Sequence, residues 1–122
     1  MKFLLNTHMN PAAWRALPED ERAAVRDGRG TFAHAITESG EMIMTQALAD
    51  PSHSAVVRVR DGEPVVSDGP YRETAEFLSG YYLIDCDDKE RAIELAARIP
   101  EARVEGFGVE VRPVMFSAGM EM

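Results

Sequence analysis

The four residues Asp68, Gly69, Pro70 and Tyr71 form the segment with the clearest potential for chemistry. The Asp68 carboxylate could accept a proton or hold a substrate hydroxyl, and the Tyr71 ring could close over the bound molecule. The same residue types also build a rigid turn, because aspartate hydrogen-bonds its own backbone, glycine allows positive φ and proline fixes the exit. The segment alone leaves both interpretations open.

Histidine titrates near neutral pH, and the chain contains three histidines. His8, at the end of the expected first strand, is placed near a cavity mouth and could help Asp68 transfer a proton. His34 follows Phe32 by two residues and is expected to point away from the core, while His53 belongs to a loop. With Asp68 as the proton acceptor and His8 or His34 as its possible helper, the candidate catalytic residues are Asp68, His8 and His34.

The sequence contains no strong pattern for a metal or a nucleotide cofactor. No two histidines have the i, i+4 spacing of a helical zinc site. Gly28-x-Gly30-x-x-Ala33 resembles a dinucleotide fingerprint, but that motif follows a strand, whereas a charged helical segment precedes this one. Cys86 is flanked by carboxylates that should raise its pKa, the opposite of a reactive thiolate. We expect no cofactor and no bound metal.

Length and charge restrict the class of protein and its partners. The 122 residues fit one domain spanning 1–122. Acidic residues outnumber basic ones by 21 to 13, giving a formal net charge of −8. Such a surface repels phosphate backbones and anionic lipid, so neither nucleic acid nor a membrane is an expected partner. The single cysteine suits a reducing compartment and the first apolar run is too short for a signal peptide, so a cytoplasmic location is expected.

The period of the apolar residues predicts the elements that must position these groups. Strands are expected over residues 2–7, 41–48, 54–60, around 65–66 after a tight Asp61-Gly62 turn, 77–85 and 108–114. Helices are expected over 19–38 and from 87 to 99, with a helical turn over 12–17. This order predicts an α+β fold with an antiparallel sheet and two helices on one face.

Each expected helix has one feature that the structure can test. Gly28 and Gly30 lie inside the first helix, where each costs about 1 kcal/mol relative to alanine, so they permit close packing or mark a break. In the second helix, Asp87 with Glu90 three residues later resembles a capping box. Pro100 is expected to end that helix.

Two helices on one side of a sheet leave its other face open. In a ferredoxin-like strand order the first and last strands are neighbours, so polar side chains of both could line this face: Asn6, His8, Glu110 and Arg112. Its apolar part is expected from Leu4, Met42, Met44 or Ile43, and Tyr82. A mixed face of this kind suits a wet pocket or a subunit interface.

Separate segments along nearly the whole chain match a known pattern in the same order. They are Val57–Gly62, Ser67–Glu76, Gly80–Asp85 and Val109–Val114, with the strand Met1–Leu5 and the helix end Ala96–Pro100. On these segments the chain resembles the YCII-related family, in the branch named for an Asp-Gly-Pro-Phe motif. The combination of several pieces, rather than one tripeptide, makes the resemblance specific.

The resemblance implies a ferredoxin-like fold that pairs into a dimeric α+β barrel, so a homodimer is the expected assembly. It also implies a cavity between helix and sheet or between subunits. It places the chain beside small barrel enzymes such as muconolactone isomerases and polyketide-tailoring monooxygenases. The biochemical role of this branch is unsettled. A family likeness gives the fold more firmly than the function.

Three positions depart from the family pattern. Tyr71 stands where phenylalanine is usual, which adds a hydroxyl, and Ala75 stands where lysine is usual. Arg29 occupies the place of a helix histidine that often precedes a Gly-x-Phe stretch. The histidine–aspartate pair proposed as catalytic in the family is therefore not intact in this chain.

Two functions from different classes fit these observations. In the first, a homodimer holds a small organic molecule in a cleft and transfers a proton with Asp68; the candidate substrate-binding residues are Tyr71, Glu73, Arg58, Tyr82 and Arg112. Glu73 and Glu76 could instead form a solvated edge. In the second, the protein is a non-catalytic ligand-binding or interaction module whose sheet face serves only dimerisation. A cavity of about 300 Å³ with convergent polar groups favours the first function, and a dry interface without a pocket favours the second.

Overall fold

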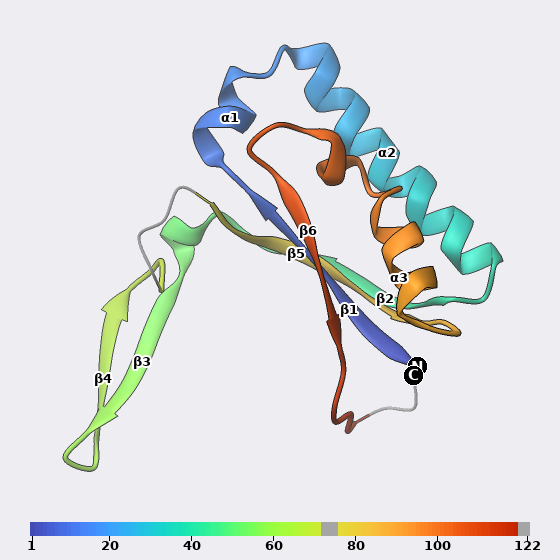
Figure 1. The fold of residues 1–122 in the computed structure, drawn as a ribbon. Helices are drawn as coiled ribbons and strands as arrows, with labels where there is room; N and C mark the ends of the chain where they lie inside the picture. The colour runs from blue at the N-terminus through green and yellow to red at the C-terminus, as the bar shows by residue number, and fades with distance from the viewer. Residues whose placement is uncertain (72–75, 120–122) are drawn as a thin grey trace.

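The computed structural model describes residues 1–71 and 76–119. In chain order the elements are β1 (Lys2–Met9), α1 (Pro11–Ala16), α2 (Glu19–Glu38), β2 (Met42–Ala47), the short 3-10 helix η1 (Pro51–His53), β3 (Ala55–Arg60), β4 (Glu63–Asp68), β5 (Phe77–Asp85), α3 (Lys89–Ala96), the 3-10 helix η2 (Pro100–Arg103) and β6 (Gly108–Pro113) (Figure 1). The helix predicted over 19–38 and the strand predicted over 77–85 are confirmed at those bounds.

Four strands form the main sheet, in the order β2–β5–β1–β6, and every neighbouring pair is antiparallel. The first and last strands are neighbours, as the sequence analysis expected. Phe3 and Leu5 are two positions apart along β1 and both are fully buried, so they lie on the core face of the sheet. The described strands do not close into a barrel within one chain.

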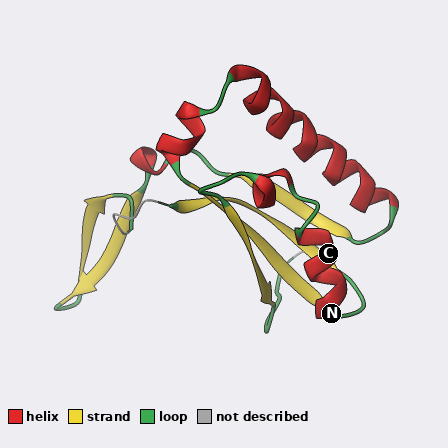
Figure 2. Ribbon diagram, turned by 45° about the horizontal axis from the view of Figure 1, so that its top comes forward, coloured by secondary structure: helices red, strands yellow, loops and turns green. Residues whose placement is uncertain are grey.

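Helices α2 and α3 lie on the same side of this sheet (Figure 2). The predicted apolar stripe of the second helix is confirmed, because each of its four residues is buried against the sheet: Ala92, Leu95, Ala96 and Ile99. Phe32 and Ile36 contribute the buried stripe of α2. The core therefore sits between the two helices and the strands β1 and β5.

The ends of α3 differ from the prediction. Asp88, not Asp87, is the N-cap residue, and its carboxylate accepts a hydrogen bond from the backbone N–H of Arg91 at 2.9 Å. The helix ends at Ala96, and Pro100 instead begins η2. Proline suits this first position because its fixed φ is already helical and its missing N–H has no helical partner there.

Helix α2 continues through both of its internal glycines, so neither marks a break. At Gly28 a Cβ atom would lie 2.7 Å from the Pro100 Cγ atom, too close for an ordinary contact. At Gly30 a Cβ would meet no atom within 4 Å. Gly28 therefore permits the close packing of η2 on α2, whereas Gly30 borders open space.

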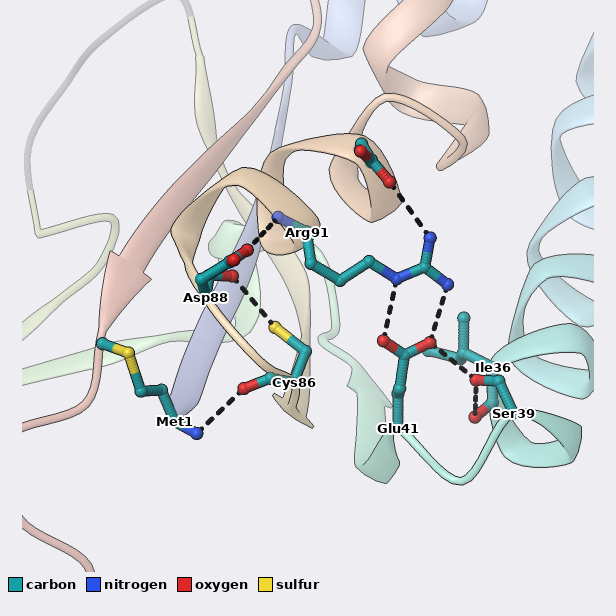
Figure 3. A network of polar contacts seen from close by, with 8 residues as sticks. Met1, Ile36, Ser39, Glu41, Cys86, Asp88 and Arg91 are labelled. Carbon is teal, nitrogen blue, oxygen red and sulfur yellow. Dashed lines mark hydrogen bonds and ion pairs between the residues drawn. The ribbon is translucent and has the colours of Figure 1, made fainter.

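An ion pair ties α3 to the turn between α2 and β2 (Figure 3). The Arg91 guanidinium donates two hydrogen bonds to the Glu41 carboxylate, both of 2.9 Å. These bonds hold the pKa of Glu41 below its ordinary value of 4.5, against the opposing effect of burial. Burial is the main reason that the pKa of the nearby Cys86 thiol is raised, with smaller contributions from carboxylates. The predicted direction for Cys86 is thus confirmed, with burial as the larger cause.

Strands β3 and β4 form a separate two-stranded hairpin that projects from the main sheet (Figures 1 and 2). Asp61 and Gly62 have φ values of 52° and 78°, which confirms the predicted tight turn. Val57 and Val66 face each other across this hairpin, and both are more than half exposed. One apolar face of the hairpin is therefore left uncovered by residues 1–71 and 76–119.

Candidate functional site

The residues predicted for catalysis and substrate binding do not gather at one place. Three of them lie at the base of the hairpin, where the Arg58 guanidinium lies 5.3 Å from the centroid of the Tyr71 ring. Asp68 is the last residue of β4 and is exposed. Glu73 lies outside the described residues.

The loop after Asp68 is shaped by a close approach of two backbones. The Gly69 N–H donates a hydrogen bond of 2.7 Å to the Ser54 carbonyl, and the following peptide bond to Pro70 is cis. Gly69 does not adopt a positive φ, so that part of the turn interpretation is wrong. A Cβ atom at this position would overlap the side chain of Ser54, and this explains the glycine.

A second group lies on the open face of the main sheet, opposite the helices. As predicted from their strand positions, Asn6 pairs with Glu110 and lies on the same face as His8 and Arg112. Asn6 Nδ2 donates a hydrogen bond of 3.0 Å to Glu110, and Arg112 donates one of 2.9 Å to the other carboxylate oxygen. The bond from Asn6 is the largest reason that the pKa of Glu110 is lowered.

Two residues predicted for this open face belong to the other face. Tyr82 pairs with Leu5, and its ring packs edge-on against Phe32 with 5.1 Å between the ring centroids. Met42 pairs with Ile84 and packs against the core, because a bulge at Ile43 shifts the register of β2. Strict alternation along β2 would place Met42 on the same face as Met44, and the bulge prevents this. Met44 does lie opposite Leu83 on the open face.

His34, the second predicted helper, points away from both groups. Its side chain is 77% exposed on α2 and lies 3.8 Å from the Glu38 carboxylate. The expectation that it faces solvent is confirmed.

A pocket of about 260 Å³ lies between α2 and the edge of the sheet formed by β2 and β5. We call it the helix–sheet pocket; its lining residues are Thr7, Arg29, Gly30, Ala33, Thr45, Gln46, Ala47, Ser79, Gly80, Tyr81, Tyr82 and Glu101. Tyr82 is the one predicted substrate-binding residue among them. Small side chains on both walls keep this space open.

Glu101 and Arg29 form the charged pair of the helix–sheet pocket. Glu101 is 2% exposed, and its Oε2 atom accepts a hydrogen bond of 3.2 Å from Arg29 Nε. The 3-10 helix η2 carries Glu101 under α2, where Gly28 allows it to pack closely. Within the described part of the chain, Glu101 Oε1 is the one buried side-chain oxygen or nitrogen without a hydrogen-bond partner.

Two aromatic residues adjoin this pair. The Tyr82 ring is buried, and burial together with the charge of Glu101 raises the pKa of its hydroxyl to about 12. On the other side, the Arg29 guanidinium lies 5.8 Å from the centroid of Trp14, whose ring contacts Phe107. Cation–π contact with Trp14 helps fix the guanidinium over the pocket.

Hydroxyl groups line the floor of the pocket at the end of β1. Thr7 Oγ1 and Ser79 Oγ are 2.9 Å apart, and Ser79 Oγ also donates to the Thr7 carbonyl. Ser79 is the extra residue of a β-bulge in β5, and this bulge brings its side chain to the pocket.

A larger groove lies on the outer side of α2. This outer groove, of about 550 Å³, is lined by mostly apolar residues of α2, together with its Glu21 and Thr31, and by Arg98, Pro100, Arg103 and Val104. Its side chains include no buried polar atom that lacks a partner, among the residues described. The helix–sheet pocket is therefore the stronger candidate for a specific site.

Sequence reasoning did not single out Glu101 at all and noted Arg29 only as a replacement for the family histidine. Glu101 follows Pro100 in a segment without regular periodicity, so nothing local indicates its burial. The one available signal was the position of Arg29, since a charge on the inner half of a helix needs a partner.

Residues 1–71 and 76–119 contain neither a candidate metal site nor a candidate membrane span. No group of three or more histidine, cysteine or acidic side chains is placed to hold a metal ion. No helix there is long and apolar enough to cross a membrane.

The fold and the site define a small α+β protein with a pocket between its long helix and an antiparallel sheet. Comparison with protein families matches residues 1–116 to the YCII-related domain, and the chain belongs to that family. It is also 35% identical over 103 residues to an uncharacterized protein of Rhizobium meliloti, covering 84% of this chain and 81% of that protein. The predicted family is confirmed.

Proposed function

We propose that this protein binds a small organic molecule in the helix–sheet pocket. The observation that carries the proposal is Glu101 Oε1, a buried carboxylate oxygen without a partner among the described residues, on a residue that lines a pocket. An acceptor left unsatisfied in the interior costs about 1–3 kcal/mol, and more when it is charged. A ligand that donates a hydrogen bond to this oxygen would recover that free energy.

The composition of the pocket supports a small-molecule site. Binding pockets combine mostly apolar walls with a few polar groups that fix orientation. Here alanine side chains and the bare backbone of two glycines form part of the walls, and Arg29, Glu101 and Tyr82 supply polar groups beside the hydroxyls of the floor. The volume and the convergent polar groups resemble the cavity expected for the first function in the sequence analysis.

Proton transfer is the simplest reaction that these groups could perform. The Glu101 carboxylate could take a proton from a bound molecule, and Arg29 could stabilise the negative charge that remains on it. Asp68, the predicted acceptor, lies at the hairpin base with Arg58 and Tyr71, and we propose for that group a role in contacts at the surface rather than in proton transfer.

Two matched substitutions on α2 test the location of the site. Ala33 lines the helix–sheet pocket and Ala35 lines the outer groove, and both side chains are half-buried. A thermal-shift screen of small metabolites on the wild-type protein provides a binder. We expect Ala33→Leu to abolish its stabilising effect and Ala35→Leu to leave it intact. Loss of binding in Ala35→Leu alone would move the site to the outer groove and refute the proposal.

We also propose that the chain folds in the ferredoxin-like manner and pairs with a second copy through its open sheet face. The strand order and the two helices on one side support the topology. Leu83 pairs with both Leu4 and Met44, which makes an apolar row across the open face that no element of the described chain covers. In this second candidate function, an interaction module, the face would serve dimerisation alone.

Sedimentation at micromolar concentration tests the proposed dimer. We expect a dimer for the wild-type protein, a monomer for Leu83→Lys, and a dimer for Val57→Lys on the exposed hairpin face. A wild-type monomer would contradict the proposal. Dissociation by Val57→Lys alone would make the hairpin, rather than the sheet, the interface.

A further inference from the structure

We propose that the ligand of the helix–sheet pocket is an uncharged small molecule that carries a hydroxyl group next to a carbonyl group. The inference rests on the proposed function, because it names the chemical class that the same pocket would bind. It follows from three properties of the pocket: the hydrogen bonds that Arg29 and Glu101 leave unmade, the charge of this pair, and the size of the space.

The first property is a hydrogen-bond donor and an acceptor placed side by side. Glu101 Oε1 needs a donor, since a carboxylate oxygen only accepts. Arg29 uses its Nε–H on Glu101 Oε2, and its other N–H groups make no further hydrogen bond with the described residues. Because Arg29 Nε and Glu101 Oε2 are joined at 3.2 Å, the free groups of the two side chains belong to one ion pair, and a ligand that carries a donor and an acceptor close together could satisfy both.

The second property is charge. The Arg29–Glu101 pair contributes one positive and one negative group, so its formal charges cancel. A carboxylate ligand that approaches Arg29 would also approach Glu101, in a protein whose net charge is already −8. An ammonium group could pair with Glu101, but its transfer from water into a buried site costs far more than that of a neutral hydroxyl. An uncharged ligand avoids both penalties.

The third property is the size and shape of the space. The volume of about 260 Å³ lies just below the roughly 300–1,000 Å³ of pockets for drug-sized ligands, so the ligand is small. The walls include Gly30 and Ala33 from the helix and Ala47 and Gly80 from the strands. Such flat walls on both sides suit a planar group, for which we choose a phenyl ring as the probe.

A series of four related compounds tests the inference in the wild-type protein. Phenacyl alcohol has a hydroxyl beside a carbonyl, acetophenone lacks the hydroxyl, phenylethanediol lacks the carbonyl, and mandelate adds a negative charge. Trp14 is the one tryptophan of the chain and lies against Arg29, so its fluorescence reports binding. We expect phenacyl alcohol to bind about tenfold more tightly than each of the other three.

Substitution of Glu101 provides a second, independent test. In Glu101→Gln the amide oxygen is expected to face Arg29, which leaves an NH₂ donor in the place of the free acceptor. Phenacyl alcohol should then lose about tenfold in affinity, whereas acetophenone, which has no donor, should change little. Arg98→Gln in the outer groove is the matched control and should leave both affinities unchanged.

The results separate this inference from the proposed function. If phenacyl alcohol fails to bind, or if mandelate, acetophenone or phenylethanediol binds as tightly, the ligand class is wrong. If another compound binds to the wild-type protein and no longer binds to the Ala33→Leu variant, the pocket is still a ligand site and only the ligand class is wrong. Should Glu101→Gln not fold, the comparison of the four compounds on the wild-type protein decides alone.

Discussion

The two glycines inside α2 give a pair of substitutions with opposite expected effects on stability. Alanine is favoured over glycine in a helix interior by about 0.8–1.0 kcal/mol, and this gain applies equally to both positions. At Gly30 nothing opposes it, because a Cβ meets no atom within 4 Å. We therefore expect Gly30→Ala to raise the free energy of unfolding by about 0.5–1 kcal/mol.

At Gly28 the same methyl group meets the ring of Pro100. The Cβ–Cγ distance of 2.7 Å would have to increase, and the proline ring belongs to η2, which is packed against the helix. Overpacking of this kind costs about 1–3 kcal/mol. After subtraction of the helical gain, Gly28→Ala should lower the free energy of unfolding by about 1 kcal/mol, a loss of roughly 4 °C in Tm.

Urea unfolding measures both variants, since a change in midpoint at constant slope reports a change in stability. A double-mutant cycle with Pro100→Ala identifies the cause: in that background Gly28→Ala should no longer destabilise, and Gly30→Ala should gain the same amount as before. Equal stabilisation by both glycine substitutions would show that η2 is not held against α2. The burial of Glu101 would then lose its explanation.

Three further results are expected. The pKa of Glu41 is lowered in the folded protein, so its ion pair contributes stability above pH 4.5 and loses that contribution as the pH falls through the folded-state pKa. Glu41→Gln should therefore be less stable than wild type at pH 7 by about 1 kcal/mol, and this difference should shrink in acid. Tyr82 should ionise near pH 12, so the late step in an alkaline absorbance titration should disappear in Tyr82→Phe. Asp68→Asn should leave Tm within about 2 °C and binding in the helix–sheet pocket unchanged, because Asp68 is exposed; loss of binding would return the catalytic role to that loop.

Much of the fold could be predicted because it depends on local patterns. The stripe of α2, the alternation of β1 and the Asp61-Gly62 turn each act over a few residues, and all three are present in the structure. The neighbouring positions of Asn6 and Glu110 were also predictable once the order of the first and last strands was known.

The errors arise where the structure depends on contacts between distant residues. The bulge at Ile43 moves Met42 to the core face, and no residue type near it signals this shift. Asp88 replaces Asp87 as the cap because both aspartates are suitable, and the packing of the whole helix selects one. Glu101 is buried by a helix that lies about seventy residues earlier in the chain, as its bond to Arg29 shows.

The identity of residue 29 connects the family resemblance with the chemistry of the pocket. A histidine in this place could carry a proton near neutral pH, whereas arginine stays charged and cannot. Arg29 can hold a carbonyl oxygen and stabilise negative charge, but any proton that is moved must go to a neighbour. Glu101 is the neighbour that the structure provides, at 3.2 Å and with one oxygen unpaired. If this chain retains proton transfer, the replacement of histidine by arginine therefore shifts the acceptor from the helix to η2.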